Sequence, residues 1–143
     1  FIYVYDFNRN WTFLLELINV SKEANPFDNC EPITDTSIEY TMQVIAGAEY
    51  QISLSSGLSW LSWASGTPTV IISGFTDVDL EPLDGVTRVI NKNVCNSCWS
   101  NHEFDPGNWN WCPIHEKTEN QFECSKTITG GEVIEKLEKL LPI

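Results

Sequence analysis

Four cysteines near the C-terminal end constrain the fold of this chain more than any other feature of its sequence. They follow the pattern C-x2-C-x13-C-x11-C, and they are Cys95, Cys98, Cys112 and Cys124. A C-x-x-C turn places two thiolates on one metal ion, and two later cysteines complete a tetrahedral set. The pattern predicts a closed, structural metal site, because protein fills every coordination position and leaves none for substrate or water.

The sulfur ligands do not fix the identity of the metal, since four thiolates suit zinc and a single iron ion equally. Two disulfides or unconnected buried thiols are the alternatives to a metal. Five cysteines are an odd number, and four of them fall within thirty residues. This crowding fits a secreted disulfide framework poorly and favours a reducing compartment, the cytoplasm. Cys30 is expected to be a free, buried thiol.

The net charge of −12 over 143 residues restricts the partners of the chain. Lys and Arg must reach phosphates to release their counterions, so no binding to nucleic acid or to anionic membranes is expected. No apolar run approaches the roughly 20 residues of a membrane span, and Phe1 begins the chain without a leader-like pattern. We therefore expect a soluble fragment of a longer protein.

The order of the apolar segments predicts an α/β fold. Strand patterns at 49–54 and 69–73 flank a turn and a short helix at 58–65, which together make a βαβ unit. Nearly continuous apolar strands are typical of a parallel sheet covered by helices on both faces. We expect one Rossmann-like domain over residues 1–143, with an irregular metal-binding insertion at about 91–127.

Further elements are expected on both sides of this unit. Alternation predicts a strand at 1–7, Asn10 is a candidate cap for a helix at 11–24, and 30–33 and 86–90 are short strand candidates. Capping-box patterns at 36–39 and 129–132 predict two more helices, the first of them ending at Gly47. Their expected apolar faces consist of Ile38, Met42, Ile45 and Ala46 in the first, and of Val133, Ile134, Leu137, Leu140 and Leu141 in the second.

The turn inside the βαβ unit is the candidate ligand site. It consists of Ser55, Ser56, Gly57, Leu58 and Ser59. Gly57 would let the backbone approach a ligand, and the amides of a helix N-terminus favour phosphate whatever the net charge. Ser73, Gly74 and Phe75 follow the next strand and should reach the same edge of the sheet. A plain strand-to-helix turn has the same appearance, so both interpretations stay open here.

The remaining polar and aromatic residues are expected to have structural or solvent-exposed roles rather than roles in catalysis or ligand binding. Trp60 and Trp63 are expected in the core, and the loop tryptophans 99, 109 and 111 are expected to shield the metal sulfurs. His102 and His115 have no identifiable partner, and we expect both to be solvated or to anchor the loop. The acidic residues Asp77, Asp79, Glu81 and Asp84 are expected to form a solvated loop.

Five segments match a known pattern when they are taken together: 55–64, 68–75, 95–99, 108–113 and 121–124. They resemble the C-terminal part of bacterial autotransporter heptosyltransferases, relatives of the lipopolysaccharide heptosyltransferases. The resemblance covers about residues 38–143, while residues 1–35 match only by expected topology. The lipopolysaccharide branch prefers an Asp-Ser-Gly-Pro turn followed by a His, where this chain has Ser55, Leu58 and Trp60.

The resemblance implies the C-terminal, nucleotide-sugar-binding half of a GT-B glycosyltransferase, with its cysteines holding iron. It implies transfer of heptose from ADP-heptose to a protein or lipopolysaccharide acceptor in the cytoplasm. The turn 55–59 would meet the donor diphosphate, and residues 73–75 would border the donor pocket. The acceptor domain and the catalytic base would lie outside this chain, so its catalytic residues are unknown and its oligomeric state stays open.

Two other functions remain open on the same residues. A non-catalytic interaction module would use the metal-clipped loop to present Trp99, Trp109 and Trp111 to a protein partner. A rubredoxin-like electron carrier would instead be a coloured iron protein with a reversible redox couple.

Overall fold

The structure is a computed structural model of the chain. It describes residues 2–6, 12–16, 30–32, 37–82, 84–103, 105, 107–108 and 111–140. Six strands form one sheet in the order β3-β2-β1-β4-β5-β6. Their bounds are β1 Ile2–Asp6, β2 Thr12–Glu16, β3 Cys30–Pro32, β4 Tyr50–Leu54, β5 Thr69–Ile72 and β6 Val86–Val89.

The predicted α/β fold is confirmed, with a sheet of mixed direction. Strands β4, β5 and β6 are parallel, and the helix at 57–64 connects β4 to β5 as the expected βαβ unit. Strand β1 runs antiparallel to both β2 and β4, so the sheet is not wholly parallel. The reason is the short connection between β1 and β2, because a link of a few residues can join only antiparallel strands.

The predicted helix at 11–24 is wrong in its first part, because residues Thr12–Glu16 form β2. In the antiparallel register Tyr3 lies opposite Leu15 and Tyr5 lies opposite Phe13. This pairing outweighs the weak helical periodicity of the segment. The rest of the predicted helix lies outside the described residues, and so do Phe1 and Phe7, the expected ends of the first strand.

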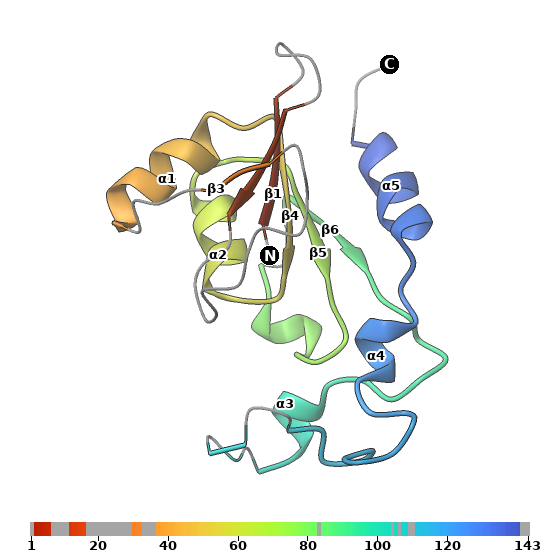
Figure 1. The fold of residues 1–143 in the computed structure, drawn as a ribbon. Helices are drawn as coiled ribbons and strands as arrows, with labels where there is room; N and C mark the ends of the chain where they lie inside the picture. The colour runs from red at the N-terminus through yellow and green to blue at the C-terminus, as the bar shows by residue number, and fades with distance from the viewer. Residues whose placement is uncertain are drawn as a thin grey trace.

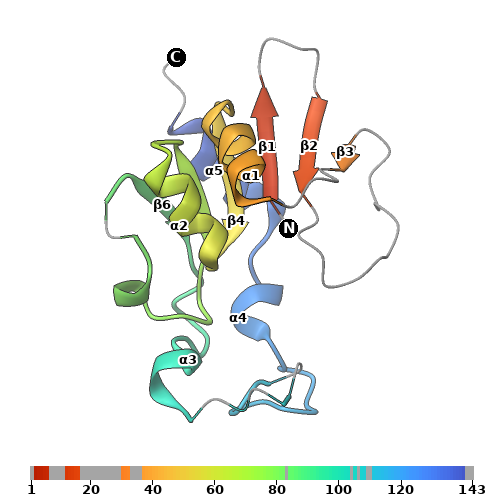
Figure 2. The same ribbon diagram turned by 90° about the vertical axis from the view of Figure 1, so that its left-hand side faces the viewer.

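Helices cover the two faces of the sheet (Figures 1 and 2). Helix α1 spans Ile38–Ala46 and α2 spans Gly57–Ala64, and both lie on one face. Helix α5 spans Gly130–Glu138 and lies on the other. Its face of the sheet holds an apolar core in which Val70, Val89 and Val133 are buried. Among the described residues no helix is long and apolar enough to cross a membrane.

The caps of these helices agree well with the sequence. Ser37 caps α1 by accepting a hydrogen bond from the Tyr40 amide, one residue later than the expected Thr36. Gly47 ends the helix as predicted. In α5 the predicted capping box of Thr129 and Glu132 is present.

The buried faces of α1 and α5 agree less well with the apolar faces expected from the sequence. In α1 Ile45 is buried as expected, but Ile38 is 61% exposed and Met42 38%, because Thr41 shares the inward face with Ile45. In α5 Ile134 is 55% exposed, whereas Leu137 and Leu140 pack on the core. Leu141 lies outside the described residues.

Helix α2 reverses the usual distribution of side chains. Ser59 and Ser62 are fully buried against the sheet, while Trp60 is 44% and Trp63 43% exposed. The expected core role of the two tryptophans is therefore wrong. The physical reason is close packing: the Ser62 hydroxyl lies 2.7 Å from that of Thr69 on β5, a distance that a bulky side chain at position 62 would not allow.

The segment that carries the four cysteines lies beyond the carboxyl ends of β4 and β5 (Figure 1). It is irregular, as predicted, apart from the short helices α3, Cys98–Asn101, and α4, Glu123–Lys126. Each short helix is preceded by a residue with left-handed backbone, Ser97 and Phe122. The segment then leads into α5, which returns the chain to the sheet.

Candidate functional site

A pocket of about 510 Å³ opens where the sheet meets the cysteine-rich segment. Ligands in open α/β sheets bind outside the carboxyl ends of the strands, which is where this pocket lies. One wall comes from the ends of β4 and β5 and consists of Leu54, Ser55, Ile72 and Phe75. The other wall consists of Trp99, Asn108, Trp111, Phe122, Cys124 and Ser125. The pocket is largely apolar and aromatic, with a few polar groups at its border.

Phe75 organises the aromatic side of this pocket. Its ring makes edge-on contacts with Trp99 and with Trp111, each at a centroid distance of 5.6 Å. Trp111 is buried and Trp99 is 41% exposed. These tryptophans form a pocket wall, a role that the sequence did not predict; Trp109 lies outside the described residues.

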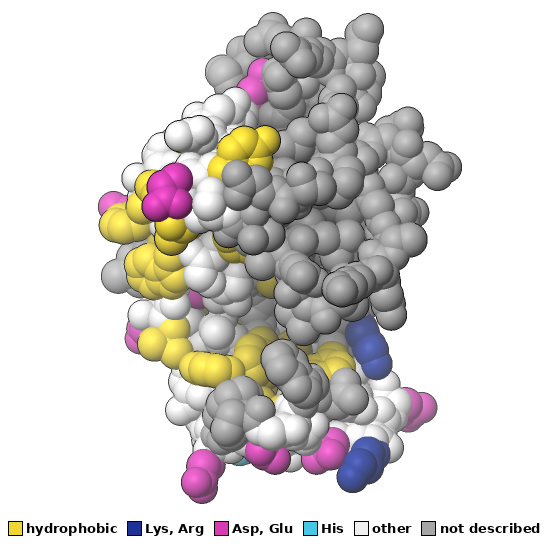
Figure 3. Space-filling view, turned by 60° about the vertical axis from the view of Figure 1, so that its left-hand side comes forward, with side chains coloured by type: hydrophobic (Ala, Val, Ile, Leu, Met, Phe, Trp, Pro, Cys, Tyr) yellow, Lys and Arg dark blue, Asp and Glu magenta, His cyan; other side chains and the backbone are white. Residues whose placement is uncertain are grey.

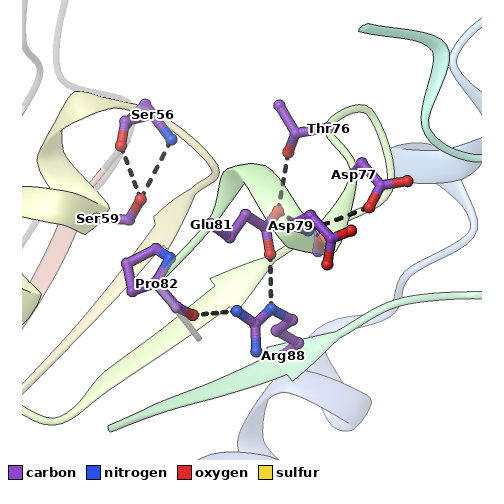
Figure 4. Close-up of polar contacts among 9 residues, drawn as sticks. Ser56, Ser59, Thr76, Asp77, Asp79, Glu81, Pro82 and Arg88 are labelled. Atoms are coloured by element: carbon purple, nitrogen blue, oxygen red, sulfur yellow. Dashed lines mark hydrogen bonds and ion pairs between the residues drawn. The ribbon is translucent and has the colours of Figure 1, made fainter. Parts of the chain in front are cut away.

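The predicted donor residues divide into two groups. Ser55 and Phe75 line the pocket, and Ser73 and Gly74 lie directly behind Phe75 in the chain. Residues 56–59 do not line it and instead form the cap of α2, where Ser56 and Ser59 bond to each other (Figure 4). The Leu58 amide also donates to the Ser56 hydroxyl, at 3.3 Å. An added Cβ on Gly57 would meet nothing within 4 Å, so the backbone is open there.

Gly74 joins the sheet edge to the cysteine-rich segment. Its φ of +138° is a conformation that residues with a side chain rarely adopt, and a Cβ there would lie 2.9 Å from Asn96 Oδ1 and 3.2 Å from Cys124 Cβ. Its carbonyl accepts a hydrogen bond of 2.7 Å from the Ser97 amide, and the Phe75 carbonyl accepts one of 3.1 Å from the Trp99 amide. The C-x-x-C turn is therefore docked on the loop after β5 by main-chain bonds.

The four predicted metal ligands are free cysteines. Three are buried, namely Cys98, Cys112 and Cys124, and Cys95 is partly exposed. The disulfide alternative is therefore not seen in the structure. For Cys30, the backbone is described as part of β3, but its side chain is not.

The thiols lie close enough to influence one another. Burial, with smaller contributions from the neighbouring charges of Cys98 and Cys124, raises the pKa of Cys95 to about 11. Burial also raises the pKa of Cys98, with smaller contributions from Cys112 and Cys124, while a hydrogen bond with Cys95 acts in the opposite direction. Several thiolates gathered in one place are thus unfavourable without a cation, which is the condition that a bound metal ion relieves.

One main-chain amide points at a cysteine sulfur, as is common for thiolate ligands. The Phe122 N–H donates to Cys112 Sγ at 3.5 Å, and the left-handed φ of 61° at Phe122 gives the backbone this orientation. The donor set of free thiols suits iron or zinc.

The tightest group of metal-ligating atoms differs from the predicted four. Among the described residues, ligand atoms of Cys95, His115 and Glu123 lie within 4.8 Å of one another, and the four sulfurs do not form such a group. His115 Nε2 is 3.1 Å from Glu123 Oε1. The expectation that His115 lacks a partner is therefore wrong. Its spacing in the sequence gave no sign of this, because α4 brings Glu123 back beside it.

The acidic loop after β5 is solvated except at one position. Asp77 caps the short 3-10 helix Val78–Leu80, and Asp84 accepts a hydrogen bond from the Trp63 indole. Glu81, by contrast, is 1% exposed and bonds to Ser73. It also bonds to Thr76 and Arg88 (Figure 4). The expected solvated role of Glu81 is wrong, because Arg88 on β6 supplies a compensating charge that the local sequence does not reveal.

Comparison with known proteins supports the family that the motifs suggested, although no family model matches the chain. It is 44% identical over 98 residues to the autotransporter heptosyltransferase Aah of Escherichia coli. It is also 39% identical over 105 residues to the autotransporter heptosyltransferase TibC of Escherichia coli O78:H11. The resemblance to autotransporter heptosyltransferases is confirmed.

These matches cover 67% and 72% of the chain but only about a quarter of each relative, 25% of Aah and 26% of TibC. A further relative, from Burkholderia thailandensis, is 44% identical over 84 residues and is named an inactive autotransporter heptosyltransferase, BimC. Similarity at this level therefore extends to a relative whose name calls it inactive.

The fold agrees with that of a solved relative. Dodecameric, iron-containing TibC, solved in complex with ADP-D-β-D-heptose, matches 78% of this chain with a TM-score of 0.71 and 38% sequence identity. The match spans 30% of the TibC chain.

Proposed function

We propose that this chain is the donor-binding part of a heptosyltransferase and that it binds ADP-heptose at the pocket beyond β4 and β5. The observation that carries the proposal is the position of the pocket, which lies at the carboxyl ends of parallel strands and has Ser55 and Phe75 in its wall. TibC, which shares this fold, was solved with ADP-D-β-D-heptose. On this proposal residues 1–143 act as one domain with an insertion at about 91–127.

Each wall of the pocket would serve a different part of the donor. The apolar and aromatic wall would hold the nucleoside and exclude water, while Ser55 would face the diphosphate. Polar groups fixed in advance stabilise the charge that develops on a leaving diphosphate. The sheet-edge group 73–75 would border the sugar. The acceptor, a protein or lipopolysaccharide, and the catalytic base would come from outside this chain.

We further propose that Cys95, Cys98, Cys112 and Cys124 hold one iron ion, as the resemblance implies, with zinc as the alternative. The ion would supply a cross-link that fixes the segment carrying Trp99 and Trp111. His115 and Glu123, which lie beside Cys95, would border the site. Such a thiol-rich site requires a reducing compartment, which favours the cytoplasm.

Calorimetric titration of the chain with ADP and with ADP-heptose tests donor binding. We expect both to bind, and we expect Trp111→Ala to weaken binding at least tenfold because it removes a pocket wall. Trp60→Ala is the matched control, since Trp60 lies on α2 and does not line the pocket. Absence of binding by the wild-type chain at millimolar nucleotide would overturn the proposal.

The exposed tryptophans of α2 favour a second candidate, a protein-interaction module. Trp60 and Trp63 pack edge-on at 5.9 Å, and both are more than 40% exposed. Figure 3 shows hydrophobic side chains at the surface of the side that carries α1 and α2. If this function holds, Trp60→Ala with Trp63→Ala abolishes self-association or partner binding measured by sedimentation, while Trp111→Ala leaves it intact.

A further inference from the structure

Glu81 is a buried carboxylate with every oxygen engaged. Its Oε1 accepts hydrogen bonds from the hydroxyls of Ser73, at 2.6 Å, and Thr76, at 2.8 Å. Its Oε2 forms an ion pair with Arg88 Nε at 2.7 Å, and Arg88 also donates to the Pro82 carbonyl (Figure 4). A buried ion pair adds little to stability compared with a well-packed apolar pair, so stability does not explain why this carboxylate is buried here.

The two hydroxyls that Glu81 holds lie on either side of Gly74 and Phe75. Ser73 is fixed a second time, because its amide donates to the Val89 carbonyl of β6 at 2.9 Å. Between the two fixed points the chain passes through Gly74, whose φ is +138°. Two sets of hydrogen bonds therefore fix the backbone of residues 73–76. Glu81 holds the hydroxyls of Ser73 and Thr76. The amides of Ser97 and Trp99, in the cysteine-rich segment, hold the carbonyls of residues 74 and 75.

This path decides where the Phe75 ring lies. Phe75 contacts Trp99 and Trp111 at 5.6 Å each, and all three rings line the pocket. A displacement of the loop would change the centroid distances and angles between these rings, on which edge-on contacts depend.

We propose that Glu81 is a positioning residue of the pocket: it holds Ser73 and Thr76 so that Phe75 keeps Trp99 and Trp111 in place as the wall that receives a nucleoside diphosphate. The ligand class rests on the proposed function, whereas the placement of the rings does not. Arg88 has a supporting role in this arrangement, since its guanidinium pairs with the buried Glu81 carboxylate at 2.7 Å.

Fluorine NMR of the chain labelled with 5-fluorotryptophan tests the proposal directly. Resonances are assigned with single Trp→Phe variants. In Glu81→Ala we expect the signals of Trp99 and Trp111 to shift or broaden, those of Trp60 to stay, and the ADP dissociation constant to rise at least tenfold. Asp79→Asn, an exposed carboxylate on the same loop, is the matched control and should change nothing.

A folded Glu81→Ala chain whose Trp99 and Trp111 signals match the wild type would overturn the proposal, even if its unfolding midpoint were lower. Should Glu81→Ala fail to fold, the double variant Ser73→Ala with Thr76→Val keeps the ion pair and removes only the two hydroxyl bonds. It must then show the same shifts, and an unchanged spectrum again overturns the proposal. Failure of the wild-type chain to bind ADP would refute the nucleotide assignment alone, because the fluorine signals still decide the role of Glu81.

Discussion

Single residues decide whether the cysteine-rich segment can dock on the sheet. Gly74 shows this most clearly, because a Cβ added there would meet Asn96 and Cys124 of the cysteine-rich segment. Glycine has no side chain with which to form a contact, yet here its absence permits both an unusual φ and a close approach of two segments. Gly57, in contrast, stands at the start of α2 with open space around it.

Gly74→Ala is expected to lower the free energy of unfolding by about 1–3 kcal/mol, because it adds backbone strain and a clash with Asn96. Gly57→Ala should change it by less than about 1 kcal/mol, since the position is helical and uncrowded. Urea unfolding of the two variants measures both values. Equal effects of the two substitutions would contradict the docking role of Gly74.

Cys95 gives a second prediction at the same scale. Its pKa of about 11 lies above its ordinary value of 9.0, so the folded, metal-free chain favours the neutral thiol. The stability that this provides is fully present below pH 9 and is lost as the pH rises through about 11. Thermal unfolding of metal-free chain between pH 8 and 11 should show a falling midpoint, and Cys95→Ser should flatten the fall. If the midpoint fell equally steeply with pH in both proteins, Cys95 would not be the source of the pH dependence.

At the scale of elements, local capping signals were reliable and face assignments were not. The box at Thr129 and the stop at Gly47 depend on neighbouring residues alone, so the sequence predicts them. The buried faces of α1 and α2 depend on what each helix meets, and serines at 59 and 62 face the sheet because the helix packs so closely. The same limit explains β2, whose cross-strand partners lie in β1.

The cap of α5 predicts a pH dependence. The pKa of Glu132 is held below its ordinary value of 4.5, first by the Thr129 amide and then by the Thr129 hydroxyl. The folded state thus favours the carboxylate, and the stabilisation is present above pH 4.5 and lost as the pH falls below it. Glu132→Gln should lose helix stability at pH 7 but differ little from wild type near pH 3. Circular dichroism melts check this, with Glu138→Gln at the other end of α5 as the control.

The candidate site as a whole was predicted in part. The sequence placed Ser55 and Phe75 at one edge of the sheet, because strand ends can be found from apolar runs, and both residues line the pocket there. It missed the tryptophan wall, the Glu81 network and the contact of His115 with Glu123. Each of these joins residues from different elements, and such contacts have no periodic signature along a chain.

Metal removal should affect the pocket as well as the cysteine-rich segment, because more than half of the pocket lining comes from that segment. After chelation we expect faster proteolysis within residues 91–127, an intact sheet by circular dichroism, and at least tenfold weaker ADP binding. Restoring iron or zinc should reverse all three changes. Pocket affinity that survives complete chelation would show that the thiol site and the pocket are independent.

The register of β1 has a consequence for anything that precedes it. Ile2 lies opposite Ser53, so the first strand starts at the end of β4 that borders the pocket and runs away from it. Polypeptide attached ahead of Ile2 would leave the sheet beside the end of β4, whose Leu54 lines the pocket, and so would start close to any bound molecule.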